Sequence, residues 1–398
     1  MKSGPLGSNL TYEEQRTRRL EYDLGPGYPD ISAPTRRLLS NLSGDIFGAR
    51  VHYDGVQAGI SDTVATTLEQ GLKTALGVRS RQTCYAVQTG SIALHRAIAS
   101  SEQFLRSRGR SATKLFTTTP CIDIIPAMAR ELISGGVEGL TMGLEGDFTS
   151  LDAASILAEV NDHLVVSDDC GAILVLTSPE NPSGRIWPAA VLEELISSLD
   201  AERVVLILDH CFLLVGTKPG NQPSAVWELD DANRPWIGVW DTGKTFGLAG
   251  DKLGFLIVPN GVLNPHVQDA ISITQYDVSN RSKLLFSSIL NSEDLNRFLF
   301  SQLQICSKNL ALLKEQIEPI GYRVLEPLGG TLSLLRTPPG FSAKEAVESA
   351  AVVGVGVIDA SVFFAPPSEA RDLVRVALAR STHDFSKAVG LLTAAWSQ

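Results

Sequence analysis

Short apolar runs alternate with amphipathic segments from about residue 70 to about residue 275. The predicted strands are apolar runs bounded by turn residues, namely Leu115–Thr118, Ile173–Thr177, Val204–Asp209 and Trp236–Trp240. The predicted helices carry apolar residues at helical spacing, namely Glu69–Leu76, Ser91–Arg108 and Pro188–Leu199. This alternation predicts an α/β fold with a mostly parallel central sheet covered by helices. In such sheets, functional groups gather beyond the carboxyl ends of the strands.

The pattern changes after about residue 280. A long helical segment is followed by a smaller α+β region, with elements expected at Asp294–Ile317, Leu332–Arg336, Ala343–Ala351 and Leu373–Leu378. The first 45 residues are rich in Gly, Pro and charge and are expected to form an arm that joins the small domain. We therefore predict an N-terminal arm at 1–45, a large domain at 46–280 and a small C-terminal domain at 281–398.

Composition narrows the functional classes. The 398 residues are 44% hydrophobic and 20% charged, which is ordinary for a globular protein. A net charge of −10 without a basic stripe argues against nucleic-acid binding. The longest apolar runs are too short for a membrane span, and no export signal is visible, so we expect a cytoplasmic protein. The five cysteines lack the spacing of metal ligands, and no metal is expected.

Two segments could bind a polar ligand. Gly90 and Ser91 precede a helix, where backbone N–H groups could hold a phosphate, although Ser91 as a plain helix cap explains them equally well. Asn181 follows a strand in the segment Pro179–Gly184, which read alone is simply a turn.

Three charged residues lie next to apolar strands. Asp209 closes the strand VVLILD, where a carboxylate is costly without a charged partner; a helix cap is the plainer interpretation. Lys244 follows a strand in a glycine-flanked turn and is the best candidate for an imine-forming amine. Arg375 opens the strand VRVALA, and a surface cation is its ordinary interpretation.

Taken together in this order, these positions resemble the fold-type-I pyridoxal-phosphate (PLP) enzymes of the class I/II aminotransferase family. The resemblance implies roles for Lys244 as the Schiff-base lysine, Asp209 as the partner of the pyridine nitrogen, Asn181 at the O3′ oxygen, Gly90, Ser91 and Lys252 at the phosphate, and Arg375 at the substrate carboxylate. It places Gly27 and Tyr28 beside the substrate. It also implies a homodimer in which Tyr53 reaches the phosphate of the neighbouring subunit.

Four residues depart from the aminotransferase pattern. Phe212 replaces a tyrosine that bonds O3′, Lys252 replaces an arginine, Asp241 replaces a serine at the phosphate, and Ile122 replaces the aromatic ring that stacks on the cofactor. The first three also resemble the PLP-dependent arginine oxidase/hydroxylase branch of antibiotic biosynthesis. Asp241 must be neutralised or turned away from a phosphate, either by an ion pair with Lys252 or by contact with a cationic substrate group.

The sequence therefore predicts an aminotransferase-like enzyme that acts on an α-amino acid through an external aldimine and a quinonoid, in secondary metabolism. The alternative is a PLP enzyme that does not transaminate, such as an amino-acid oxidase or hydroxylase, an elimination enzyme or a carbon–carbon bond-forming enzyme. A minor alternative is a PLP-binding regulator without catalysis.

Overall fold

The computed structural model describes residues 20–30, 36, 40, 59–79, 81–141, 152–215, 225–229, 234–275, 278–364 and 370–397. Tyr53 lies outside the described residues, so its predicted contact with a neighbouring subunit stays a prediction.

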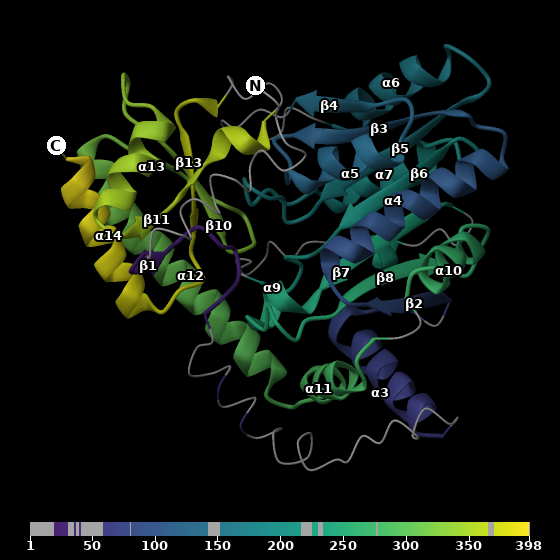
Figure 1. The fold of residues 1–398 in the computed structure, drawn as a ribbon, viewed down its shortest axis with the longest axis horizontal. Helices are drawn as coiled ribbons and strands as arrows, with labels where there is room; N and C mark the ends of the chain where they lie inside the picture. Colours follow the sequence, from purple (N-terminus) through teal and green to yellow (C-terminus); the bar gives the residue numbers. More distant parts are fainter. Residues whose placement is uncertain are drawn as a thin grey trace.

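A seven-stranded sheet forms the larger part of the molecule (Figure 1). Its order is β2-β8-β7-β6-β5-β3-β4, with bounds β2 (Gln82–Val87), β3 (Ala112–Thr119), β4 (Val137–Thr141), β5 (Cys170–Thr177), β6 (Val204–Asp209), β7 (Trp236–Asp241) and β8 (Gly254–Pro259). The strands from β7 to β4 are parallel, whereas β8 and β2 are antiparallel to their neighbours. Strands β5 to β8 are buried at every position, which explains why they appear in the sequence as continuous apolar runs.

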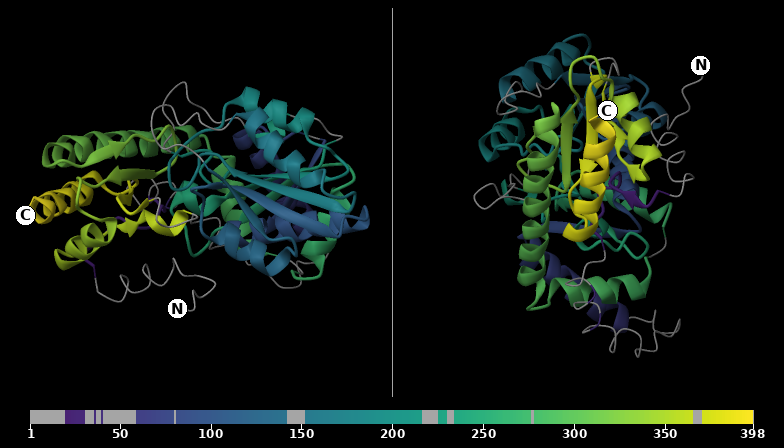
Figure 2. Two further views of the ribbon diagram at one scale, coloured as in Figure 1. Left: turned by 90° about the horizontal axis from the view of Figure 1, so that it is seen from above. Right: turned by 90° about the vertical axis from the view of Figure 1, so that its left-hand side faces the viewer.

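Helices cover both faces of this sheet (Figure 2). One face packs on α4 (Gly90–Ser107), α5 (Ile124–Leu132) and α10 (Asn264–Ser272). The other face packs on α3 (Gly59–Leu76), α6 (Ala153–Leu164), α7 (Ala189–Ser198), α8 (Val226–Leu229) and α11 (Asn280–Leu290). Alternate residues of one strand serve the two faces: Ile173 and Val175 of β5 face α4, and Leu174 faces the opposite layer.

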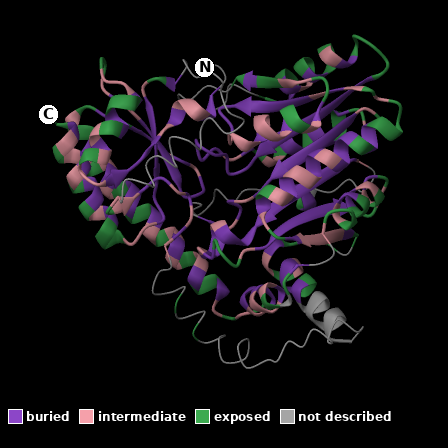
Figure 3. Ribbon diagram, in the orientation of Figure 1, coloured by how far each residue is buried: buried purple, intermediate pink, exposed green. Residues whose placement is uncertain are grey.

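The smaller part is built on a four-stranded antiparallel sheet of order β12-β13-β10-β9. Its strands are β9 (Arg323–Leu325), β10 (Leu332–Arg336), β12 (Ile358–Asp359) and β13 (Leu373–Ala377). The accompanying helices are α12 (Leu295–Ile317), η2 (Glu318–Ile320), α13 (Ala343–Val352), η3 (Ala360–Phe363) and α14 (Thr382–Trp396). Buried residues line the strands of both sheets and the inner sides of the helices (Figure 3). The predicted architecture, a mostly parallel sheet with a smaller α+β part, is confirmed.

The described part of the N-terminal arm lies against the small part. Strand β1 (Tyr22–Asp23) pairs in parallel with β11 (Val355–Gly356), and the N–H of Ala377 donates to Leu24 O at 2.7 Å. The arm therefore lies beside β13, the strand that carries Arg375.

The predicted domain boundaries, after residues 45 and 280, stay predictions. The packing of the hydrophobic core provides evidence on the boundary after residue 280. Helix α11 lies beyond residue 280, yet Phe286 and Ile289 belong to the core under the large sheet, where α11 packs against α3. Phe298 of α12 belongs to the same core. We therefore propose that the large domain extends into the first turns of α12.

Candidate functional site

Three polar groups meet at one edge of the large sheet because they follow three neighbouring parallel strands. Asn181 follows β5, Asp209 ends β6, and Lys244 follows β7. Thr177 pairs with Asp209 in the register of β5 and β6, so these strands end at the same level. The structure thus brings together the residues that the sequence predicted for the ring end of the cofactor.

Lys244 lies on α9 (Thr242–Phe246), a single helical turn directly after β7. Gly247 ends this turn with φ of 72°, a left-handed conformation that glycine adopts without strain. The Lys244 Nζ atom lies 3.6 Å from the centre of the Tyr28 ring and 5.6 Å from that of Phe212. The amine is therefore enclosed by aromatic faces, which stabilise a cation.

Asp209 is buried and has no cation within ion-pair distance among the described residues. Its Oδ1 accepts the N–H of Cys211 at 3.0 Å, so it caps no helix. Burial raises the pKa of Asp209 above its ordinary value, and the charge of Asp241 adds to this rise. The thiol and the N–H of Cys211 and the charge of Lys244 oppose it. A buried carboxylate of this kind favours a cationic partner from a ligand.

The neighbouring residue His210 fixes the end of β6, a role that no sequence pattern indicated. Its Nδ1 lies 3.0 Å from Ser178 O, and its Nε2 accepts the N–H of Val226 at 3.1 Å. Burial lowers the pKa of His210 to about 4, so the ring is neutral and Nδ1–H donates to Ser178. His210 therefore ties Asp209 to the turn that carries Asn181.

Arg375 lies in the interior of the protein. Its interpretation as a surface cation is therefore wrong. It is 7% exposed. Its Nη1 donates to Asn181 Oδ1 at 2.9 Å, and its Nη2 donates to Gly25 O at 3.0 Å. The guanidinium carbon lies 4.6 Å from the centre of the Phe363 ring. A fixed guanidinium beside Asn181 is suited to bind a carboxylate.

Asp241 is directed at backbone amides. Its Oδ2 accepts the N–H of Gly90 at 2.7 Å, and its Oδ1 accepts those of Gly243 at 2.7 Å and Lys244 at 3.3 Å. No ion pair joins it to Lys252 in the described part of the chain, so that predicted contact is wrong. Asp241 is instead the cap of α9 and a link to the start of α4, and its contact with a cationic substrate stays a prediction.

Lys252 bonds to the arm. Its Nζ donates to the Tyr28 hydroxyl at 2.7 Å. Burial alone would lower the pKa of Lys252, but the bond to Tyr28 and the negative charge of Asp241 together raise it. Tyr28 thus touches both lysines of the site.

The remaining predicted residues surround this edge. Gly90 begins α4 and is buried, whereas Ser91 is exposed; the cap of α4 is Thr89, whose hydroxyl accepts the N–H of Ile92 at 3.1 Å. The interpretation of Ser91 as a helix cap is therefore wrong.

Phe212 is buried, and a Cβ on Gly27 would lie 3.3 Å from its ring, so only glycine fits there comfortably. Ile122 is half-buried before α5.

Arg380 is a second residue that the sequence did not single out. Its guanidinium donates to three carbonyl oxygens of the arm, those of Asp23 at 2.8 Å, Pro26 at 2.8 Å and Tyr28. Asp30 adds an ion pair to Arg380 at 3.7 Å and accepts the N–H of Ser381 at 2.9 Å. Arg380 therefore clamps the arm segment that holds Tyr28.

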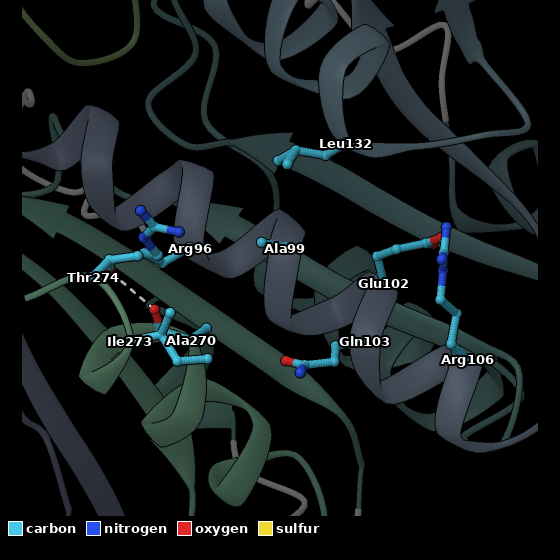
Figure 4. A pocket seen from close by; sticks show the side chains of 9 residues that line it. All are labelled: Arg96, Ala99, Glu102, Gln103, Arg106, Leu132, Ala270, Ile273 and Thr274. Atoms are coloured by element: carbon cyan, nitrogen blue, oxygen red, sulfur yellow. Dashed lines mark hydrogen bonds and ion pairs between the residues drawn. The ribbon is translucent and has the colours of Figure 1, made fainter.

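Two cavities lie at different distances from the sheet edge that carries Asn181, Asp209 and Lys244. One of about 610 Å³ is lined by residues 21–24, 26 and 28–30 of the arm together with Arg380 and Asp384, so Tyr28 forms part of its wall. The other, of about 360 Å³, lies between α4 and α10 (Figure 4). Its residues on α4 run from Arg96 to Arg106, so it is separate from the first turn of α4, which contacts Asp241.

The described residues of this edge fit the PLP that the resemblance implies. Asp209 offers a buried carboxylate for a pyridinium nitrogen, Lys244 an amine for the carbonyl carbon, and Lys252 a cation for the phosphate. No cluster of metal-ligating side chains was found within the described ranges. No described helix is both long and apolar enough to cross a membrane.

Comparison with known proteins identifies the family to which this chain belongs. The family model of aminotransferase class I and II matches residues 150–389. A histidinol-phosphate aminotransferase of Methylibium petroleiphilum is 28% identical over 144 residues, which cover 35% of this chain and 34% of that protein. The chain thus spans about a third of the length of this curated relative.

Two solved structures share nearly the whole fold. An aspartate aminotransferase double mutant of Thermus thermophilus superposes with a TM-score of 0.74 at 18% identity, covering 99% of this chain and 97% of that one. MppP soaked with the product 2-ketoarginine superposes with a TM-score of 0.75 at 18% identity, covering 94% of this chain and 100% of that one. At these identities the likeness shows the fold alone.

Proposed function

The chain belongs to the aminotransferase class I and II family, and we propose that it acts on an α-amino acid, with the residues at this sheet edge as its active site. The family depends on PLP, and the predicted fold type is confirmed. The observation that carries the proposal is the convergence of Asn181, Asp209 and Lys244 on one edge, with Arg375 bonded to Asn181.

Three residues would hold the cofactor, each at a different group. Lys244 would hold it covalently through Nζ, Asp209 would keep its ring nitrogen protonated, and Lys252 would bind its phosphate. When bound, the cofactor supplies an electron sink for the bonds at the substrate Cα. The buried position of Asp209 strengthens its interaction with a cation, because the local dielectric is low.

The substrate would be oriented by Arg375. Its guanidinium is held by Asn181 and Gly25, so it can bind a carboxylate in a fixed direction and aim the Cα–H bond. Lys244, once its amine is free, would move the proton at Cα. The Tyr28 ring beneath this amine excludes water from one side of it.

Transamination is the first candidate reaction, and one observation favours a second. Phe212 has no hydroxyl and lies 5.6 Å from Lys244 Nζ, so the hydrogen bond that a tyrosine gives the cofactor oxygen is lost. Asp241 also differs from the usual serine. These changes support oxidation, hydroxylation, elimination or carbon–carbon bond formation as the alternative, and the fold of MppP is compatible with it.

We propose that the protein is a homodimer in which Tyr53 completes the neighbouring site, that it serves secondary metabolism, and that it is cytoplasmic. The first rests on the resemblance of the segment around Tyr53.

The test mixes the holoenzyme with each amino acid, with and without 2-oxoglutarate, and follows the absorption spectrum, oxygen consumption and product mass. Transamination predicts amino transfer only when the oxo acid is present. Oxygen consumption without an oxo acid would support the oxidase alternative. If no amino acid changes the spectrum, the proposal of an amino-acid substrate is wrong.

A further inference from the structure

The bond between Lys252 and Tyr28 leaves a donor available. A lysine ammonium has only donors, so the phenol oxygen must be the acceptor in this 2.7 Å contact. The O–H proton of Tyr28 is then free to donate to another group. Lys252 also keeps two further N–H donors. The pair therefore offers an anion one O–H and an ammonium at the same place.

The start of α4, by contrast, has few amide donors left. Asp241 accepts the N–H of Gly90 at 2.7 Å, and the Thr89 hydroxyl accepts that of Ile92 at 3.1 Å. Two of the first three amides of this helix are thus bonded to side chains of the chain itself. A helix start that binds phosphate through its amides normally leaves them available to the ligand. The phosphate end consequently needs donors from elsewhere.

Tyr28 is held where such a donor is needed. Arg380 donates to the carbonyl oxygens of Asp23 and Pro26 and to that of Tyr28 itself. Its ring lies 3.6 Å from Lys244 Nζ, while its hydroxyl reaches Lys252. One side chain therefore spans the distance between the attachment point of the cofactor and the cation for its phosphate.

We propose that Tyr28 is a phosphate-binding residue, whose O–H donates to the cofactor phosphate beside Lys252 and replaces the hydroxyl that Asp241 does not provide. This assigns Tyr28 to the cofactor and not to the substrate, where the sequence placed it. The inference rests on the proposed function only in that the cofactor occupies this edge of the sheet. Arg380 is then a positioning residue that acts through Tyr28.

The test compares PLP with pyridoxal, which lacks the phosphate, in Tyr28→Phe. Apoprotein is titrated with each compound, and binding is followed by absorbance and intrinsic fluorescence. Loss of a hydrogen bond to a charged group predicts a dissociation constant for PLP that rises about 10-fold or more, with that for pyridoxal changed less than about 2-fold. The matched control is Tyr85→Phe on the edge strand β2, whose hydroxyl donates to Asn264 at 2.8 Å.

Two outcomes would overturn the inference: PLP affinity unchanged in Tyr28→Phe, or equal weakening of PLP and pyridoxal, which would show that the ring alone matters.

A second variant, Arg380→Lys, loses the fork to the arm carbonyls and should weaken PLP selectively in the same assay; an unselective loss would contradict the positioning role. The ³¹P resonance of the bound phosphate should shift in both variants and stay unshifted in Tyr85→Phe. Failure of the proposed function would appear differently, as tight PLP binding by the unaltered protein with no response to any amino acid.

Discussion

The ring end and the phosphate end of the site are built in different ways. At the ring end, Asn181, Asp209 and Lys244 follow three adjacent parallel strands, so the sheet itself sets their positions. At the phosphate end, the Asp241 carboxylate accepts a hydrogen bond from the N–H of Gly90, and Lys252 donates one to Tyr28 of the N-terminal arm. At the ring end, Asn181, Asp209 and Lys244 match the family pattern, although Phe212 and Ile122 depart from it. At the phosphate end, Asp241 and Lys252 both depart from the pattern and make contacts of their own.

This difference shows how a site can change without losing its core chemistry. In the proposed site, the ring end would determine where electrons go; Asn181 and Asp209 are buried there, and Lys244 is half-buried. The phosphate end serves mainly to hold the cofactor, and several combinations of donors can do this. Asp241 is compatible with such a site because its carboxylate is bonded to backbone amides and does not face an anion unshielded.

The largest effect is expected at the ring end from Lys244→Ala. The amine that holds the cofactor and moves the Cα proton would be lost, and general acid–base catalysis alone contributes roughly 10²–10⁴-fold. We expect kcat to fall about 1,000-fold or more with the fold intact by circular dichroism. Lys114→Ala, which removes a partly exposed lysine paired with Glu138, is the control and should keep full activity. Retained turnover in the Lys244 variant would reject its assignment.

The next largest effect is expected from Arg375→Ala. Loss of a charged, buried hydrogen-bond pair should cost about 2–4 kcal/mol of transition-state binding for the amino acid. Steady-state kcat/KM should fall far more for the amino acid than for the corresponding decarboxylated amine. Arg336→Ala, which removes an ion pair with Asp372 just before β13, is the matched control. Equal losses on acid and amine would remove Arg375 from the substrate site.

A pH effect on stability is expected from Glu180, the residue before Asn181. Burial raises its pKa from 4.5 to about 7, against the opposing effects of the Ser183 donors and the charge of Arg185. Between these two values the folded protein keeps a proton that the unfolded chain has lost. The free energy of unfolding must therefore fall as the pH rises through this window, by about 3 kcal/mol.

The substitution Glu180→Gln should remove this contribution. Urea unfolding at about pH 5 and about pH 8 would measure the difference for both proteins at one concentration. The wild type should lose more stability on going to the higher pH than the variant does. An identical loss in both would show that Glu180 does not carry the buried proton.

The smallest effect is expected from Asp241→Asn, at the phosphate end. An amide keeps one acceptor oxygen, so it cannot serve both Gly90 and Gly243, and loss of part of a helix cap costs about 1–2 kcal/mol. Thermal unfolding should show this loss while the order of substrate preference is preserved. Asp152→Asn, which alters the exposed cap of α6, is the control for a simple capping effect. A selective loss on cationic substrates would instead place Asp241 in the substrate pocket.

The sequence predicted the fold well where burial is complete. The fully buried strand β6 was predicted with the bounds that the structure has, because an apolar run that ends in Asp209 specifies it. The bounds of β10 were also predicted, although its sequence includes Ser333 and Arg336. The strand β2 was missed, since at one edge of the sheet it mixes polar and apolar residues. The short helix α9 was also missed, because its five residues are too few to show helical periodicity.

The sequence predicted the ring end better than the phosphate end for a related reason. Asn181, Asp209 and Lys244 each follow a recognisable strand, so their meeting follows from the parallel topology. The contact between Tyr28 and Lys252 joins residues 224 positions apart, and nothing local signals it. The direction of the Asp241 carboxylate depends on the path of Gly90 in three dimensions, which also cannot be read from a local pattern.

The most direct test of the account is to locate the cofactor on the chain. Purified holoenzyme would be reduced with borohydride, digested and analysed by peptide mass spectrometry. The account predicts one pyridoxyl group, on Lys244. Labelling of Lys252 or of any other lysine in place of Lys244, or no labelling of a protein that binds PLP, would contradict it.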